Sequence, residues 1–275
     1  MAATLMLGNE IATKTYEYVK NKVESLSTRG VTPYLVAILV GDDPGSMAYL
    51  KIKAKMCMDC GIKFSLLEFP SNIAENELID QINLLNQSLE VTGIIIQLPL
   101  PISINRDAVL LAVSEHKDID AFSYTLRKTS AISVRPPAPA GMIEILNHYN
   151  VSMANKRVVI VGEGLLVGQP LEKMLIEAHI YPTVIHDQSE KSLQVLKEAD
   201  VVFCGVGKAN IITPEMLRFK VVVIDAGYNK VNGVTYGDCD LRCAQIASFI
   251  TPSIGGIGPL TVSNLLKNVV DIIEK

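Results

Sequence analysis

The chain has 275 residues, of which 49% are hydrophobic and 20% charged, with a formal net charge of −4. This length suits two domains with sizeable cores. The small negative charge and the absence of basic blocks argue against nucleic acid or an anionic membrane as a partner. No apolar run reaches membrane-spanning length, and the apolar opening stops at Gly8-Asn9-Glu10, so we expect a cytoplasmic protein.

The five cysteines do not suggest a disulfide framework, because their number is odd. Cys57 and Cys60 form a C-x-x-C pair, and three residues separate Cys239 from Cys243. A shared metal site is conceivable, but the first pair falls within a helical pattern and no histidine is near either pair. Free thiols are the favoured interpretation, and we expect no metal.

The first elements in chain order are a helix over 10–26 and a continuous apolar strand over 34–40. Ser46 is expected to cap a second helix, over 47–60. On that helix Tyr49 and Lys53 share one face near the strand tip. A partly desolvated lysine there would have a lowered pKa and could transfer protons. Spacing alone favours the alternative, in which Lys53 lies on a solvated face and Tyr49 packs on the core.

A second helix–strand unit follows, with a helix over 75–85 and a buried strand over 94–96. Gln97 stands at the strand tip, where it is either a site residue or a loop-fixing hydrogen-bond partner. Lys117-Asp118-Ile119-Asp120 supplies two acids that either form a turn or hold a ligand. Residues 136–141 are proline-rich and are expected to form a stiff linker before a helix over 142–149.

The stretch from Lys156 to Ile176 predicts a buried strand, a glycine turn and a helix. Its G-x-G-x-x-x-G spacing (Gly162, Gly164 and Gly168) is one residue longer than the usual dinucleotide fingerprint. Such a turn directs helical N–H groups at a phosphate. The alternative is an ordinary strand-to-helix turn without a ligand.

Three further strands are expected, at 183–186, 201–207 and 221–227. The first ends in Asp187, 19 residues beyond Gly168, and the others run into glycine. Strands alternating with helices predict a doubly wound parallel sheet with its ligand at the strand C-termini. A glycine-rich loop over 250–261 then leads into a final helix over 262–274, which we expect to pack back on the first domain.

Five motifs in this order resemble the bifunctional methylenetetrahydrofolate dehydrogenase/methenyltetrahydrofolate cyclohydrolase family. They are Gly45-Ser46-x-x-Tyr49-x-x-x-Lys53, Gln97-Leu98-Pro99-Leu100-Pro101, Lys117-Asp118-Ile119-Asp120, Val167-Gly168-x-Pro170 and Gly255-Gly256-Ile257-Gly258-Pro259-Leu260-Thr261. The resemblance covers nearly the whole chain and implies a homodimer of two α/β domains, the second Rossmann-like, with a folate cleft between them. It also implies a multifunctional enzyme of one-carbon metabolism and purine biosynthesis.

The implied reactions are oxidation of 5,10-methylenetetrahydrofolate by a nicotinamide cofactor and hydrolysis of the methenyl product to 10-formyltetrahydrofolate. By resemblance, Lys53 is the general acid/base of hydrolysis and Gln97 tunes its protonation. Tyr49 stacks on the folate, and Asp120 accepts hydrogen bonds from the pterin. The resemblance adds Leu98, Pro99, Gly258 and Pro259 as folate contacts.

The expected dinucleotide contacts are Gly162, Glu163, Gly164, Val167, Gly168, Asp187, Gly207, Tyr228 and Thr261. The family implies NADP. Glu163 stands where the family commonly has arginine, and a carboxylate repels a 2′-phosphate. Asp187 is of the type that binds a ribose 2′-hydroxyl, while Lys191 is near enough in sequence to offset it. The choice between NAD and NADP stays open at this point.

The chain departs from the family pattern between Ala121, where the family usually has glycine, and Ala138. A Pro-x-Asn-x-Gly segment is missing, Pro-Cys-Thr-Pro has become Pro136-Pro137-Ala138-Pro139, and Ile254 replaces a proline of the late loop. Two alternatives therefore stand beside the bifunctional enzyme. One is a dehydrogenase with little cyclohydrolase activity, and the other is a non-catalytic folate- or dinucleotide-binding paralogue.

The expected domain boundaries combine these observations. Residues 1–138, completed by the C-terminal helix 262–275, are expected to form the folate-binding catalytic domain. Residues 139–261 are expected to form the dinucleotide-binding Rossmann domain.

Overall fold

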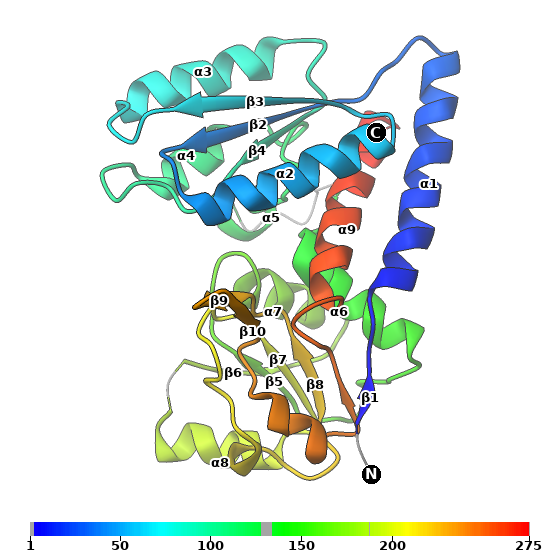
Figure 1. Cartoon of the computed structure of the whole chain (residues 1–275), viewed down its shortest axis with the longest axis vertical. Coiled ribbons are helices and arrows are strands. Elements are labelled where there is room, and N and C mark those ends of the chain that lie inside the picture. Colours follow the sequence, from blue (N-terminus) through cyan, green and yellow to red (C-terminus); the bar gives the residue numbers. More distant parts are fainter. Residues whose placement is uncertain (1–2, 128–133, 187, 275) are drawn as a thin grey trace. The chain divides into compact units, whose positions relative to one another are not determined.

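The structure is a computed structural model and describes residues 3–127, 134–186 and 188–274. The chain folds into two compact units (Figure 1). Unit 1 comprises residues 1–13 and 137–261, and unit 2 comprises residues 14–136 and 262–275. Residues 1–13 were expected with the first domain. They lie in unit 1 because the short strand β1 (Thr4–Leu5) pairs with β11 (Phe249–Ile250).

Unit 2 contains a three-stranded parallel sheet in the order β3-β2-β4. Its strands are β2 (Tyr34–Val40), β3 (Lys63–Phe69) and β4 (Gly93–Ile96). The helices α2 (Pro44–Asp59) and α3 (Glu75–Gln87) connect them and flank the sheet in Figure 1. The connection through α2 leads from β2 to β3 on one side, and the connection through α3 leads from β3 back across β2 to β4 on the other side. Because both connections are right-handed and run in opposite directions across the sheet, α2 and α3 lie on opposite faces of the sheet.

The core of unit 2 is built from both ends of the chain. One face of β2 packs on α1 (Asn9–Thr28), α2 and α9 (Ile257–Asp271). Residues of α9 that are at most 3% exposed in this cluster are Val262, Leu265, Leu266, Val269 and Val270. The short helices α4 (Arg106–Ala112) and α5 (Phe122–Leu126) complete the unit, and a 3₁₀ turn (Ile272–Glu274) follows α9.

Unit 1 contains a six-stranded parallel sheet in the order β1-β11-β8-β7-β5-β6. Besides β1 and β11, its strands are β5 (Val158–Val161), β7 (Val201–Cys204) and β8 (Val222–Asp225) in the interior and β6 (Thr183–Ile185) at the edge. The helices are α6 (Pro137–His148), α7 (Gly168–Glu177) and α8 (Glu190–Glu198). A hairpin of β9 (Asn229–Val231) and β10 (Val234–Tyr236) and 3₁₀ turns at Pro214–Met216 and Leu241–Gln245 complete the unit.

The strand order of unit 1 reverses between β5 and β7. The chain goes from β5 outward to β6, and then returns across β5 to β7 and β8. In doubly wound sheets such a switch point opens a crevice at the strand C-termini, where ligands bind. The predicted fold class, two α/β domains of which the second is doubly wound, is therefore confirmed.

Three predicted boundaries are wrong. Asp43, not Ser46, caps α2, because its carboxylate accepts the Ser46 backbone N–H at 2.6 Å and the helix begins at Pro44. The proline-rich segment 137–141 is the start of α6 rather than a linker, since the first turn of a helix needs no N–H donors. Residues 257–261 form the first turns of α9 rather than a loop.

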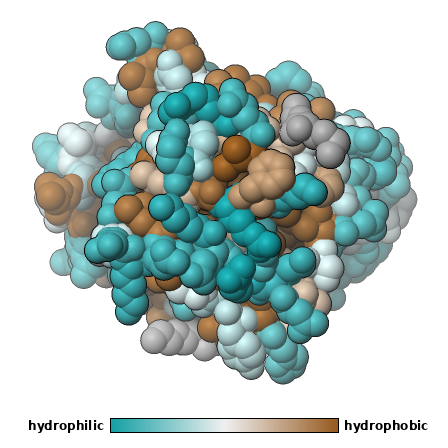
Figure 2. Space-filling view, turned by 90° about the horizontal axis from the view of Figure 1, so that it is seen from below, coloured by the Kyte–Doolittle hydropathy of each residue, from teal (hydrophilic) through white to brown (hydrophobic). Residues whose placement is uncertain are grey.

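The surface drawn in Figure 2 is mixed, with hydrophobic residues set among polar ones. Exposed large hydrophobic residues include Leu89, Ile102, Tyr181 and Leu241. Among the helices that the structure describes, none has both the length and the apolar composition needed to cross a bilayer.

Candidate active site and dinucleotide pocket

Lys53 is the centre of a buried polar cluster in unit 2. Its side chain is only 6% exposed, although it lies on a helix with exposed Lys51 and Lys55 on either side. Its Nζ donates a hydrogen bond to Gln97 Oε1 at 3.3 Å and lies 4.8 Å from the centre of the Tyr49 ring. The structure therefore brings together three residues that the sequence placed on one helix face and at one strand tip.

Gln97 is held in one orientation at the end of β4. Its backbone N–H donates to Ile38 O at 2.9 Å, which extends the strand pairing. Its side-chain NH₂ donates to Leu98 O at 2.8 Å, and Ser46 Oγ donates to the same carbonyl. With the NH₂ group fixed in this way, Oε1 is left to accept from Lys53.

The two acids of the Lys117–Asp120 motif have different environments. Asp118 is 2% exposed and accepts hydrogen bonds from Phe122 N, Ser123 N and Ser123 Oγ, so it fixes the start of α5. Asp120 is half-buried and interacts electrostatically with Lys53 and Tyr49. Asp118 thus forms the turn, and Asp120 is the acid that faces the lysine cluster.

Burial dominates the electrostatics of this cluster. Loss of water lowers the pKa of Lys53, and the nearby Asp120 carboxylate opposes that shift without cancelling it. Loss of water also raises the pKa of Asp120 to about 6, with Lys53 acting in the opposite direction. The pKa of Tyr49 is raised by burial. Each group is thereby shifted toward its neutral form, which suits an amine that must accept a proton near neutral pH.

Ala121 shows why the family usually has glycine at this position. Its φ is 58°, in the left-handed region that a side chain disfavours. Ala121 is 1% exposed and precedes α5, so the altered segment keeps the turn at a conformational cost of about 1 kcal/mol. The rest of the altered segment includes residues 128–133, which lie outside the described residues.

The remaining predicted folate contacts lie in two places. Leu98 and Pro99 follow Gln97 in unit 2, where Pro99 is exposed. Gly258 and Pro259 belong to unit 1 and to the first turns of α9. Thr261, a predicted dinucleotide contact, lies in the same turns, where its Oγ1 donates to Ile257 O at 3.1 Å. A Cβ added to Gly258 would meet no atom within 4 Å.

The glycine turn after β5 requires its glycines at two positions. Gly162 has φ 86°, and a Cβ on Gly168 would lie 2.1 Å from Gly162 O and 2.8 Å from Glu163 Cα. The first turn of α7 therefore packs directly on the strand end. Gly164, in contrast, has open space around it, because the nearest atom to a Cβ added there would be Gly205 O, at 4.0 Å.

A pocket of about 370 Å³ lies beside this turn, at the switch point of the sheet. Its walls include Gly162, His186 and Gln188 on one side and Val206, Lys208 and Ile211 on the other. Glu163 and His186 form a weak, exposed pair, with 3.8 Å between Oε1 and Nδ1. A single pocket thus carries an open glycine turn, apolar walls and a lysine, a composition that fits a nucleotide.

Of the predicted dinucleotide contacts within the described ranges, Gly162 is the one that lines this pocket. Glu163, Gly164, Val167 and Gly168 belong to the adjoining turn, Gly207 lies on the loop after β7, and Tyr228 is 68% exposed after β8. Asp187 lies outside the described residues. Sequence reasoning missed His186, Gln188 and Lys208; the position of Lys208 directly after the Gly207 turn is the signal that could have found it.

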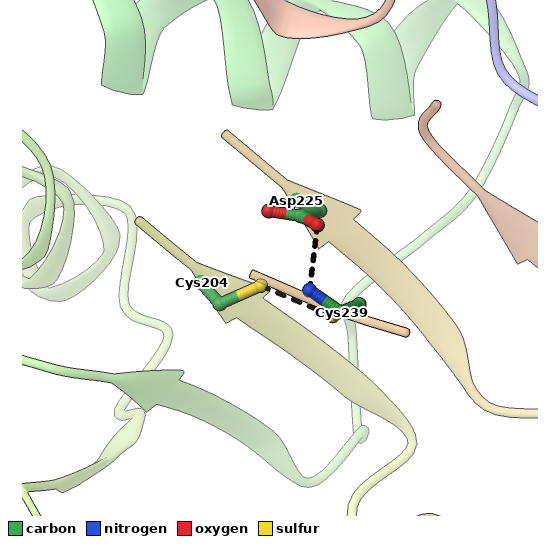
Figure 3. Close-up of side chains that lie close together, drawn as sticks. All are labelled: Cys204, Asp225 and Cys239. Atoms are coloured by element: carbon green, nitrogen blue, oxygen red, sulfur yellow. Dashed lines mark hydrogen bonds between the residues drawn. The ribbon is translucent and has the colours of Figure 1, made fainter. Parts of the chain in front are cut away.

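One group in the described part of the chain could hold a metal: Cys204, Asp225 and Cys239 (Figure 3). The two sulfurs lie 3.3 Å apart, and Asp225 accepts the backbone N–H of Cys239 at 2.9 Å. The hydrogen bond with Cys239 and burial together raise the pKa of the Cys204 thiol. These groups are buried and paired with one another, and the absence of a bound metal stays a prediction.

Two family models match the chain. The catalytic domain of tetrahydrofolate dehydrogenase/cyclohydrolase matches residues 6–120, and its NAD(P)-binding domain matches residues 136–275. The chain belongs to this family.

Relatives and solved structures agree with this membership. The chain is 38% identical to the bifunctional protein FolD of Bacillus subtilis over 276 residues, covering 98% of this chain and 97% of the relative. The FolD crystal structure from Campylobacter jejuni has a TM-score of 0.93 at 35% identity and 99% coverage of both chains. A Trypanosoma brucei FolD complexed with NADP and an inhibitor has a TM-score of 0.91 at 27% identity, covering 100% of this chain and 98% of that one.

Membership in the tetrahydrofolate dehydrogenase/cyclohydrolase family confirms the predicted activity. The chain is an oxidoreductase and hydrolase that converts 5,10-methylenetetrahydrofolate to the methenyl and then the 10-formyl derivative, with a nicotinamide cofactor. Its second family domain is the NAD(P)-binding one, in the part of the chain that contains the doubly wound sheet.

Proposed function

We propose that Lys53 is the general acid/base of the hydrolytic step. The observation that supports this role is the buried Nζ, which is hydrogen-bonded to a neutral amide rather than paired with a carboxylate. A lowered pKa leaves part of the lysine as a neutral amine, which can take a proton from water as the water oxygen attacks the methenyl carbon. The same proton can then be given to the ring nitrogen as the carbon–nitrogen bond breaks.

The neighbouring side chains have distinct proposed roles. Gln97 presents only its Oε1 to Lys53 and so orients the amine. Tyr49 supplies an aromatic face for the folate, and Asp120 accepts hydrogen bonds from the pterin N–H groups. Leu98, Pro99, Gly258 and Pro259 are proposed as further folate contacts. In the oxidation step the hydride passes directly from the methylene carbon to the nicotinamide, so these groups act there only by positioning.

Replacement of Lys53 by methionine tests this assignment. Methionine keeps an unbranched apolar chain but has no proton to exchange, so hydrolysis of methenyltetrahydrofolate should fall by about 10²–10⁴-fold. Oxidation of methylenetetrahydrofolate should fall much less. Lys51→Met, on the exposed side of the same helix, is the control and should leave both rates unchanged. Equal losses in the two steps would contradict a role in proton transfer.

The same assay shows how the altered 121–138 segment affects the balance of the two steps. Slow hydrolysis would make the methenyl product accumulate already in the unmutated protein.

We also propose that the pocket at the switch point binds the adenosine side of the dinucleotide. Among the residues that the structure describes, Glu163, His186 and Lys208 border it. Glu163 disfavours a 2′-phosphate, whereas Lys208 favours one. NADP, as in the Trypanosoma brucei relative, and NAD are therefore both to be assayed.

Glu163→Gln measures how far this carboxylate controls the choice. Removing one negative charge should raise kcat/KM for NADP relative to NAD by roughly 10-fold, because only NADP carries the 2′-phosphate. Glu172→Gln, on the following helix, serves as a charge-matched control. An unchanged ratio would mean that Glu163 does not face the 2′-position.

A homodimer is proposed on family grounds alone. Light scattering of the purified protein should then give twice the chain mass of 29.9 kDa.

A further inference from the structure

Two buried carboxylates in unit 1 have no role in the scheme above. Asp225 ends β8, and Asp238 lies in the segment that returns from the β9–β10 hairpin; they are 4% and 0% exposed. Asp225 accepts hydrogen bonds from the backbone N–H groups of Gly227, Asp238 and Cys239, the last of which is drawn in Figure 3. It thereby fixes the returning segment against the end of β8.

Asp238 fixes the neighbouring loop, which follows β7, in the same way. Its carboxylate accepts the backbone N–H groups of three consecutive residues after β7, namely Val206, Gly207 and Lys208. The distances from Gly207 N and Lys208 N are 3.2 and 3.0 Å, and Asn229 Nδ2 adds a fourth donor at 2.9 Å. Consecutive N–H groups that converge on one anion form a stable concave loop conformation.

Both carboxylates lie in space that glycines leave open. A Cβ on Gly227 would lie 2.3 Å from Asp238 Oδ1, and a Cβ on Gly237 would lie 2.1 Å from Asp225 Oδ2. The sequence therefore provides the acids together with the gaps that receive them. This arrangement is a built feature of the fold rather than an accidental contact.

The loop that Asp238 holds is one wall of the dinucleotide pocket. Val206 and Lys208 line the pocket, and a Cβ on Gly162 would lie 3.0 Å from Val206 Cγ2. The carboxylate itself is absent from the pocket lining and acts through the backbone.

We propose that Asp238 is a positioning residue for the dehydrogenase step, which holds the Val206–Lys208 loop in the shape that receives the dinucleotide. This inference rests on the proposed function of the pocket. The carboxylate is specifically required, because asparagine at this position would offer one oxygen to four donors and would turn its own NH₂ group toward N–H groups. The loop would then lose its fixed shape, and the cofactor would have to order it on binding.

The test compares Asp238→Asn with the unmutated full-length protein. We expect the KM for the dinucleotide and its dissociation constant to rise by at least 10-fold, with a smaller change in kcat. Hydrolysis of methenyltetrahydrofolate, measured without dinucleotide, should stay within about 2-fold. Asp240→Asn is the control, since Asp240 is two residues away and pairs with Arg242 at the surface; it should leave dinucleotide affinity unchanged.

The outcomes separate this inference from the proposed function. Unchanged dinucleotide affinity in Asp238→Asn would overturn the positioning role alone. Failure of the unmutated protein to bind either dinucleotide would overturn both proposals. If the variant does not fold, amide hydrogen exchange on the unmutated, cofactor-free protein decides. The Val206, Gly207 and Lys208 amides should then be protected nearly as well as those of β7, and exchange at the rate of free amides would refute the proposal.

Discussion

Two opposing effects act on the amine of Lys53. Burial lowers its pKa, while the Asp120 carboxylate raises it, and burial has the larger effect. Gln97 adds no charge to this balance, because it occupies the hydrogen-bonding position of Nζ with a neutral group. A charged residue at that position would pair with the ammonium and stabilise the protonated form.

Gln97→Glu should therefore raise the pKa of Lys53. The neutral amine is the form that accepts a proton, so the rate of hydrolysis should rise with pH in the unmutated protein, and this rise should move to higher pH in the variant. At pH 7 the variant should be slower by roughly 10-fold or more. The pH–rate profile of methenyltetrahydrofolate hydrolysis measures the shift.

Gln97→Met is the matched control for this experiment. It removes the hydrogen bond without adding charge, so its profile should not move to higher pH. A profile for Gln97→Glu that coincides with that of the unmutated enzyme would show that Lys53 is not the group that titrates in catalysis.

At the scale of the elements, strands with a continuous apolar sequence were predictable, and a strand of mixed composition was not. The continuous apolar runs of β2, β5, β7 and β8 identify them in the sequence. The strand β3 was missed, because Lys63–Phe69 mixes charged and apolar residues and lies at an edge of its sheet. The start of α6 was missed because its prolines suggested a linker, although proline is compatible with a helical first turn.

The candidate site shows the same division. Helix spacing placed Tyr49 and Lys53 on one face, and the strand tip placed Gln97. Spacing alone favoured a solvated Lys53, however, and this was wrong, because the packing of unit 2 buries the side chain to 6% exposure. The difference between Asp118 and Asp120 could not be read from the sequence, since it depends on which acid accepts the first backbone N–H groups of α5. Asp238 escaped notice because its partners are some 30 residues away in the chain.

The turn between β5 and α7 gives a test at this scale. Gly168→Ala should destabilise unit 1 by about 1–3 kcal/mol, because the new Cβ would lie 2.1 Å from the backbone oxygen of Gly162. Dinucleotide affinity should fall as well, since the turn must move. Thermal and urea unfolding, together with the KM for the dinucleotide, measure both effects.

Gly164→Ala is the internal comparison for that variant. Its Cβ would have no neighbour closer than 4.0 Å, so stability should change by no more than about 0.5 kcal/mol. Equal destabilisation by the two substitutions would contradict the close packing of α7 on the strand end.

At the scale of the whole molecule, each unit is assembled from segments distant in the chain. Unit 2 takes residues 262–275 into its core, and unit 1 takes residues 1–13 into its sheet. The site around Lys53 therefore depends on residues more than 200 positions away. The amphipathic pattern of the last helix predicted that it packs on the first domain. A two-residue strand such as β1 has no sequence pattern that predicts its pairing.

Leu266→Ala should reveal this dependence. Leu266 is fully buried in the core that also contains Leu50 and Cys57 of α2. Truncation to alanine should cost about 2–5 kcal/mol, and methenyltetrahydrofolate hydrolysis should fail at a lower temperature than in the unmutated protein. Leu241→Ala, at a side chain 72% exposed, is the control and should leave the melting temperature unchanged. A fully stable Leu266→Ala protein would show that α9 is dispensable for unit 2.

The exchange of terminal segments has a consequence for synthesis on the ribosome. Domains that are continuous in sequence can fold one after the other as they emerge. Neither unit can do so here. The edge strand β1 can pair only after β11 has been synthesised, and the core around Lys53 is complete only after the last turns of α9 have been synthesised. Nascent chains that stop short of residue 262 thus lack the α9 residues of this core, so the capacity for hydrolysis should appear only after α9 has left the ribosome.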